Sequence, residues 1–180
     1  MAGKKLNLGC GKDTLPKEKG WINQDIFQFG NVDIIFDFNK YPWPFKDNQF
    51  EEVRIWNCLF LAKDFVRFMK EVYRVAKPNA KIIIQNQFFL STESANYPYN
   101  PTQTNYNSFD IFLKEGEFNI KEKIEFEITK RKWIFSENRH LSFLNTFPNI
   151  FPKFYGRFLY FIFPSNKLYF ELRTIKHLSL

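Results

Sequence analysis

Residues 5–11 constrain the fold of this chain more than any other stretch, because a short apolar strand there runs directly into a Gly-x-Gly turn. The strand is Lys5-Leu6-Asn7-Leu8 and the turn is Gly9-Cys10-Gly11. Glycine has no Cβ, so it allows a tight turn with positive φ and a close approach of the backbone to a ligand. In open α/β sheets, ligands bind at the carboxyl ends of the strands. The sequence therefore predicts an α/β fold with a binding loop after its first strand.

A carboxylate ends the next strand signal. The run Trp21-Ile22-Asn23-Gln24-Asp25 has the length of a strand and closes with Asp25. The carboxyl ends of neighbouring parallel strands lie at the same edge of a sheet, so Asp25 is placed to bind a hydroxyl group of a ligand held by the glycine turn.

The first half of the chain alternates strand signals with turns and one clear helix. Short apolar runs predict strands over residues 6–8, 21–25, 32–36, 52–56 and 81–85. Residues 12–19 contain Pro16 and several charges and indicate a loop. Asp64 is a good N-cap for a helix over residues 65–76, which Pro78 ends, and Asn79 suits a left-handed turn. A strand, a helix and a strand imply a right-handed parallel crossover.

The second half is less regular. Residues 91–107 are rich in Ser, Thr, Asn, Tyr and Pro without a periodic pattern, which is typical of a lid or binding loop. A short helix is expected over 108–114, a turn over 115–117, a half-exposed strand over 118–129 that residues 133–136 extend or pair with, and a final strand over 168–175. An apolar stripe at helical spacing covers residues 151–162.

Composition favours one globular domain over residues 1–180. The net charge of +7 is spread evenly along the chain, which favours a solvated surface over a nucleic-acid footprint. Two cysteines, Cys10 and Cys58, and no leader segment indicate free thiols in a reduced, cytoplasmic protein. No Cys/His spacing suits a metal site, and no apolar run is long enough to cross a bilayer.

Several of these motifs together resemble class I S-adenosylmethionine-dependent methyltransferases. They are Asn7-Leu8-Gly9-Cys10-Gly11, Gly20-Trp21-Ile22-Asn23 with Asp25, residues 32–38, residues 41–50 and residues 65–78, with a weaker likeness at 163–164 and 168–176. The closest likeness is to the small branch whose first helix is reduced to a loop. The resemblance implies a Rossmann-like fold, with a seven-stranded, mostly parallel sheet and an antiparallel last strand.

The resemblance also implies S-adenosylmethionine as the cofactor and a set of contacts to it. The methionine moiety and the ribose would lie along Leu8, Gly9, Cys10 and Gly11, and Asn57 would line the methionine side. The ribose hydroxyls would be bound by Asp25, with Ile26 beside it. The adenine would be flanked by Asp37 and Phe38. For Asp37 the alternative is a loop carboxylate that caps local amides. A nicotinamide cofactor is less favoured, because Thr14 stands where that fingerprint has its third glycine.

The chain departs from the family pattern after the fourth strand, where Asn57-Cys58-Leu59-Phe60 replaces a frequent His or Glu-His pair. Two functions therefore remain: a methyltransferase, or a degenerate cofactor-binding protein with a regulatory or partner-binding role. No catalytic residue is assigned. Glu93, Tyr97 and His140 are candidate bases, each more typical of a surface, lid or packing residue.

The acceptor is expected to be a small molecule, a glycan or a lipid-linked compound, met by residues 91–115. Nucleic acid is not favoured as the acceptor. Enzymes of this fold that methylate base amino groups typically carry Asp/Asn-Pro-Pro-aromatic after the fourth strand, and no prolines follow Asn57. Enzymes that methylate carbon 5 of cytosine need a cysteine that commonly follows a proline, and Cys58 does not. The stripe over 151–163, with Lys153 and Arg157, is expected to cover one face of the sheet. Peripheral contact with a membrane is the alternative for this stripe. The oligomeric state is left open.

Overall fold

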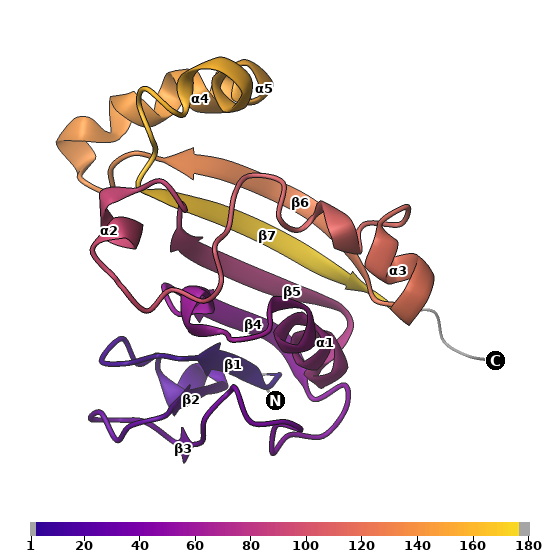
Figure 1. The fold of residues 1–180 in the computed structure, drawn as a ribbon. Coiled ribbons are helices and arrows are strands. Elements are labelled where there is room, and N and C mark those ends of the chain that lie inside the picture. The colour runs from indigo at the N-terminus through magenta and orange to yellow at the C-terminus, as the bar shows by residue number, and fades with distance from the viewer. Residues whose placement is uncertain (1–2, 177–180) are drawn as a thin grey trace.

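The computed structural model describes residues 3–176, which form a seven-stranded sheet in the order β3-β2-β1-β4-β5-β7-β6 (Figure 1). The strands are β1 (Lys5–Leu8), β2 (Trp21–Asp25), β3 (Ile34–Ile35), β4 (Phe50–Trp56), β5 (Ala76–Gln87), β6 (Glu125–Ile134) and β7 (Lys167–Ile175). Strands β1 to β5 pair in parallel, whereas β7 lies antiparallel between β5 and β6. The predicted fold class is confirmed.

Helix α1 (Phe65–Val75) connects β4 and β5 as predicted. Oδ1 of Asp64 accepts a hydrogen bond from the Arg67 backbone N–H at 2.9 Å, which satisfies one of the free amides at the helix start. The helix ends at Val75, earlier than expected, because the residue before Pro78 disfavours the α conformation. Asn79 has a φ of 65°, the predicted left-handed conformation.

The region of the first helix is a loop with a single short turn, η1 (Lys17–Lys19). The buried side chain of Asn23 holds this loop, because its Oδ1 accepts from the Leu15 N–H at 2.7 Å and its Nδ2 donates to the Leu15 carbonyl at 2.8 Å. The prediction that the first helix is reduced to a loop is confirmed.

One face of the sheet carries the core and the other is charged. Core-face side chains such as Leu6, Val53 and Ile82 are fully buried, on the side that α1 covers. The alternate positions of the same strands carry ion pairs, for example Lys5 with Glu52 at 3.2 Å. Parallel sheets are usually covered by helices on both faces. Here the first helix is reduced to a loop, and the face that it would cover carries charged pairs instead of apolar side chains.

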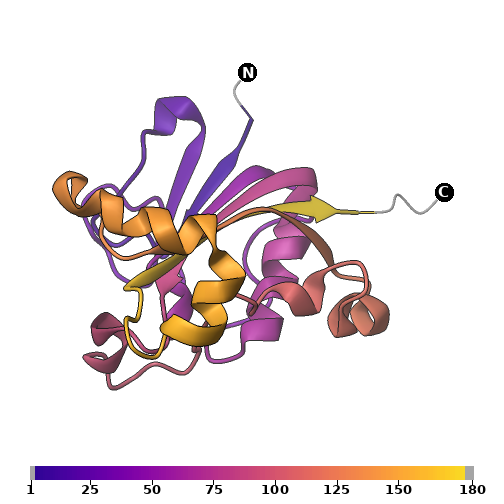
Figure 2. The ribbon, with the colours of Figure 1, turned by 90° about the horizontal axis from the view of Figure 1, so that it is seen from above.

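The remaining helical segments follow β5. They are α2 (Thr92–Ala95), η3 (Asp110–Phe112), α3 (Glu117–Glu122), η4 (Arg139–Asn145), α4 (Thr146–Ile150), α5 (Pro152–Phe154) and the π-turn η5 (Tyr155–Leu159), with η2 (Leu59–Leu61) after β4. Seen from above, the segment from η4 to η5 forms a layer apart from α1 and α3 (Figure 2). In Figure 1, α4 and α5 lie beyond β6, away from β3.

Three local predictions were wrong. The strand expected over 118–129 begins only at Glu125, because residues 117–122 form α3. Tertiary packing decides this: a Cβ on Gly116 would lie 2.3 Å from the Ile111 carbonyl oxygen, and the Phe118 ring lies 5.9 Å from that of Phe112. The strand over 32–36 has only two residues, and 108–114 contains only the turn η3.

The apolar stripe over 151–163 was also assigned wrongly. Phe154 is 50% exposed and Phe158 is 57% exposed, and only Tyr155 of the stripe is buried. The helical segment is interrupted at Phe151, between α4 and α5, and continues from α5 into η5. It meets β6 through Tyr155, while most of its apolar side chains face outward.

Candidate functional site

The glycine turn after β1 has the backbone conformation that only glycine adopts freely. Gly9 has a φ of 62° and Gly11 a φ of 53°. A Cβ on Gly9 would lie 2.6 Å from Sγ and 2.7 Å from Cβ of Cys58, whereas a Cβ on Gly11 would meet no atom within 4 Å. Gly9 is thus fixed by packing against the protein, and Gly11 borders open space.

Asp25 lies directly against this turn. Its Oδ2 accepts from the Gly11 backbone N–H at 2.7 Å, and its Oδ1 accepts from the Phe27 N–H at 3.1 Å. The residue is 8% exposed. An ionised carboxylate has about four lone-pair sites, so each oxygen retains an acceptor position for a ligand hydroxyl. The structure brings the predicted turn and the predicted acid together.

Gln24 positions the same turn, and the sequence analysis missed it. Its Oε1 accepts from the Gly9 N–H at 3.0 Å, and its Nε2 donates to the Phe36 carbonyl at 2.6 Å. Its buried side chain therefore ties the turn after β1 to the chain after β3. The available signal was the polar run of residues 23–25 inside a strand that the fold requires to be buried.

Phe38 borders the turn, and Ile26 lies at the end of β2 next to Asp25. Cε1 of Phe38 lies 3.5 Å from the position of a Cβ on Gly9, and its ring packs edge-on against Phe68 at 5.3 Å. Ile26 follows Asp25 directly and is 48% exposed, so its apolar side chain is available for contact with a planar group.

Asp37 makes the local contact expected of a capping carboxylate. Its Oδ1 accepts from the Asn39 backbone N–H at 2.9 Å. The side chain of Asn39 in turn donates to the Leu61 carbonyl and accepts from the Lys63 N–H, so the loop after β3 is bound to the segment after β4. A role in ligand binding would use the remaining lone pairs of Asp37.

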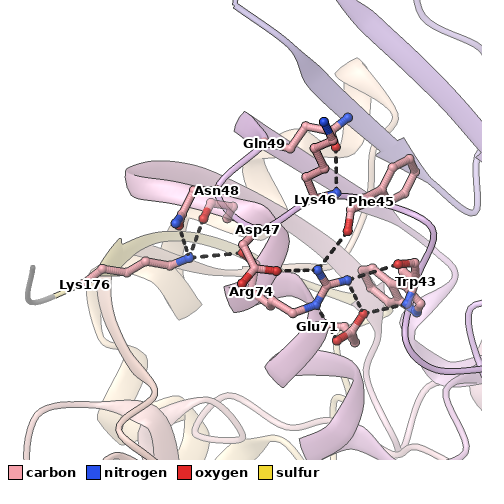
Figure 3. Close-up of polar contacts among 10 residues, drawn as sticks. Trp43, Phe45, Lys46, Asp47, Asn48, Gln49, Glu71, Arg74 and Lys176 are labelled. Carbon is pink, nitrogen blue, oxygen red and sulfur yellow. Dashed lines mark hydrogen bonds and ion pairs between the residues drawn. The ribbon is translucent and has the colours of Figure 1, made fainter. Parts of the chain in front are cut away.

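The loop before β4 is held on α1 by a charged network (Figure 3). Arg74 contacts both carboxylate oxygens of Glu71 at 2.8 Å and the carbonyls of Trp43 and Phe45, while Glu71 Oε2 accepts from the Trp43 N–H at 2.7 Å. Burial opposes ionisation of Glu71, but Arg74 and the Trp43 N–H hold the pKa of the carboxyl below its usual value. Trp43 Nε1 donates to the Phe38 carbonyl, so this network also fixes the loop that carries Phe38.

Asn57 follows β4 at the same edge of the sheet. It has a φ of 53°, and its N–H donates to the Gln85 carbonyl at 2.8 Å. Its Oδ1 is buried without a hydrogen-bond partner in residues 3–176. A buried, unpaired acceptor is costly, so this atom marks a position where a ligand donor would be stabilising.

Both thiols at the site are buried and held mainly in the protonated form. Cys58 donates to the Leu8 carbonyl at 3.2 Å, and both cysteines are buried and free. Burial, together with the Asp25 carboxylate, raises the pKa of Cys10 to about 11 and that of Cys58 to about 12. The reactive form of cysteine is the thiolate, so both thiols are inert near neutral pH.

The three candidate bases lie in different surroundings. Tyr97 is 44% exposed and packs edge-on against Phe60, close to the segment after β4, at a centroid distance of 4.9 Å. Glu93 lies 3.9 Å from Lys167, and His140 is exposed in η4. Only Tyr97 of the three contacts a loop at the carboxyl ends of the central strands. In residues 3–176, no cluster of His, Cys, Asp and Glu could hold a metal ion.

A separate cleft of about 840 Å³ opens between residues 105–110, β6 and the helical segment of α5 and η5. Its lining includes Tyr106, Arg131, Trp133, Lys153 and Arg157. The rings of Tyr106 and Trp133 stack at 4.7 Å with an interplanar angle of 9°. Nε1 of Trp133 is buried and has no hydrogen-bond partner within the described residues.

Comparison with known proteins identifies this architecture. Residues 13–84 match the family model described as "Methyltransferase domain". A search of curated protein sequences gave no match. The sequence resemblance to class I methyltransferases is therefore confirmed by the family model over this stretch and by the fold.

Solved structures share the fold at low sequence identity. A methyltransferase of Archaeoglobus fulgidus, described as S-adenosylmethionine-dependent, is 16% identical with a TM-score of 0.56, over 96% of this chain and 86% of that one. The phosphoethanolamine N-methyltransferase 2 of Haemonchus contortus, in complex with S-adenosylmethionine, is 16% identical with a TM-score of 0.59, over 98% of this chain and 49% of that one. The [4+2]-cyclase SpnF is 14% identical with a TM-score of 0.63, over 98% of this chain and 76% of that one. At these identities the likeness shows the fold.

Proposed function

We propose that this chain, whose residues 13–84 match the methyltransferase-domain model, binds S-adenosylmethionine and transfers its methyl group to a small-molecule, sugar or lipid-linked acceptor. The observation that carries the proposal is the pairing of a glycine turn with a carboxylate at the carboxyl ends of β1 and β2, where Gly11 donates to Asp25 at 2.7 Å.

The residues around the turn fit this cofactor. Gly11 borders open space, Asp25 has acceptor positions for ribose hydroxyls, and the Oδ1 of Asn57 is an unpaired acceptor for a methionine amino group. Phe38 and Ile26 would supply apolar contacts to the adenine. The glycine turn is followed by a loop and the short turn η1, not by a helix whose N-terminus could donate to a pyrophosphate, which favours an adenosyl sulfonium over a dinucleotide.

When bound, S-adenosylmethionine supplies an activated methyl group on a positively charged sulfur. The chain's contribution is to hold donor and acceptor in line, which can lower a barrier by about 7–11 kcal/mol in favourable cases. A proton has to be removed only from an acceptor that arrives protonated. Tyr97 is the candidate base whose ring lies against the segment after β4.

The cleft beside residues 105–110 is proposed as the acceptor site. Residues 91–115 were predicted to meet the acceptor, and part of this segment lines the cleft together with Trp133. The unpaired Nε1 of Trp133 would donate to an acceptor oxygen, and Lys153 and Arg157 favour an anionic group. We expect Trp133→Phe, which keeps a ring beside Tyr106, to lower methyl incorporation without changing cofactor affinity.

Calorimetry with Asp25→Asn tests the cofactor proposal. The variant keeps the size of the side chain and one acceptor oxygen but loses the charge, so we expect S-adenosylmethionine affinity to fall by about tenfold or more. Wild-type protein should bind S-adenosylmethionine and S-adenosylhomocysteine and not NAD. Unchanged affinity in a folded Asp25→Asn would show that the ribose is bound elsewhere.

The second candidate function is a degenerate cofactor-binding protein. The observation in its favour is that Asn57-Cys58-Leu59-Phe60 replaces the polar pair that relatives often carry after the fourth strand. A [4+2]-cyclase with the same fold shows that the architecture also serves other chemistry. Transfer of a tritiated methyl group to any fraction of a cell extract supports the enzyme, whereas tight S-adenosylhomocysteine binding without transfer supports the alternative.

A further inference from the structure

The largest group of exposed apolar side chains lies in the helical segment beyond β6. Of the sixteen large hydrophobic residues that are exposed within residues 3–176, eleven lie in residues 141–163, each between 44% and 69% exposed. Rings in this set touch one another: Phe154 lies 6.5 Å from Phe147 and 5.2 Å from Phe158. Together these side chains expose apolar area on the order of 1,000 Å², and large exposed apolar surfaces are typical of interaction sites. We propose that residues 141–163 dock on an anionic lipid surface, independently of the cofactor proposal.

Hydrogen bonds and one buried side chain attach the segment to the sheet, and they fix the orientation in which its apolar side chains face outward. Asn149 accepts from the Trp133 N–H at 3.0 Å and donates to the Trp133 carbonyl at 2.8 Å, which pairs the open edge of β6. Asn145 accepts from the Phe135 N–H at 2.7 Å. Tyr155 is 1% exposed, and its hydroxyl donates to the Phe163 carbonyl at 2.6 Å. These contacts use the polar and buried positions and leave the phenylalanine rings facing outward.

The charge of the segment matches an anionic surface. From residue 138 to residue 166 the sequence contains no Asp or Glu, whereas it contains Arg139, Lys153 and Arg157. Apolar side chains that insert at an interface, flanked by basic side chains, are the two contributions that hold an interfacial helix on anionic lipid. Among the described helices, none is long and apolar enough to cross a bilayer.

A second copy of the chain fits this surface less well. A symmetric dimer uses the same patch on both subunits, so Lys153 and Arg157 of one copy would approach the same residues of the other. No acidic side chain within residues 138–166 would neutralise them. A membrane supplies the opposite charge and leaves the cleft between α5, η5 and β6 next to the lipid headgroups.

Flotation with lipid vesicles tests the proposal. We expect the full chain to bind vesicles of phosphatidylcholine with about one third phosphatidylglycerol, and to bind vesicles of phosphatidylcholine alone much more weakly. The double variant Phe154→Ser, Phe158→Ser should lose about tenfold or more of the binding. The double variant Lys153→Gln, Arg157→Gln should lose about fivefold for each charge, mainly on the anionic vesicles.

Control variants elsewhere on the surface and a measurement of folding distinguish a specific effect on lipid binding from a general one. Tyr99→Ser removes an aromatic side chain that is 55% exposed elsewhere, and Lys40→Gln with Lys63→Gln removes two exposed charges elsewhere; both should bind vesicles as the wild type does. Circular dichroism must show that each variant is folded. Binding that is absent, or equal in the Phe154 and Tyr99 variants, would overturn the proposal. Dimerisation in light scattering that the Phe154→Ser, Phe158→Ser variant abolishes, without vesicle binding, would assign the surface to a second copy instead.

Discussion

The two glycines of the turn after β1 should respond differently to the same substitution. Both have positive φ, so alanine at either position costs about 1–2 kcal/mol of folding free energy from backbone strain alone. At Gly9 the new Cβ would also lie 2.6 Å from Sγ of Cys58, and overpacking of this kind costs about 1–3 kcal/mol more. We therefore expect Gly9→Ala to lower the free energy of unfolding by about 2–5 kcal/mol and Gly11→Ala by about 1–2 kcal/mol.

Cofactor affinity should be lost in Gly11→Ala, the variant that loses less stability. The Cβ of Gly11→Ala would meet no protein atom within 4 Å and would extend into the space assigned to the cofactor. A folded Gly11→Ala should therefore lose about tenfold or more in S-adenosylmethionine affinity while most of its stability remains. Cofactor binding by Gly9→Ala is measured only under conditions where the variant is folded.

Urea unfolding and calorimetry on the two variants check both parts. Equal losses of stability would show that Cys58 moves aside, and the packing argument at Gly9 would fail. Wild-type affinity in Gly11→Ala would refute the assignment of the open space beside Gly11 to the cofactor, whatever the stability results.

Three further outcomes are expected. Asn57→Gly keeps the positive φ and removes the unpaired oxygen, so the free energy of unfolding should change by less than about 1 kcal/mol. Calorimetry should show that the cofactor binds about three- to tenfold more weakly. Glu71→Gln removes the charged contacts of Glu71 with Arg74, which keeps its ion pair with Asp47, and should cost about 1–3 kcal/mol in urea unfolding. Because the folded pKa of Glu71 is lowered from 4.5, its contribution is complete above pH 4.5 and is lost as the pH falls through the folded value, so the wild type should lose more stability in acid than the variant. Cys10 and Cys58 should react with iodoacetamide at pH 8 at a rate about a hundredfold or more below that of a free thiol, by mass spectrometry, because burial raises their pKa values.

The site was readable from the sequence where local geometry and strand order suffice. Gly9 and Gly11 mark a turn that only glycine adopts freely, and Asp25 ends the neighbouring parallel strand, so their approach follows from the topology. The N-cap of α1 and the left-handed Asn79 are also local features, and both are present.

The sequence could not predict the features that depend on which segments meet. Gln24 holds the turn only because the chain after β3 brings the Phe36 carbonyl beside it. The polar run of residues 23–25 indicates a buried polar side chain but does not indicate these partners. The cleft joins residues 105–110 to α5 and η5 across β6, three segments that no pattern relates.

The residue pattern by itself determined the crossover helix and the binding turn, because each follows from periodicity and from what glycine and proline permit over a few residues, whereas the seven-stranded sheet was expected from the resemblance to a known family. Periodicity says which side chains share a face, and it does not say whether that face meets the sheet or the solvent. Only the tertiary structure decided that residues 151–163 face outward, because Asn149 and Tyr155 occupy the contacts with β6 and leave the phenylalanine rings no place in the core.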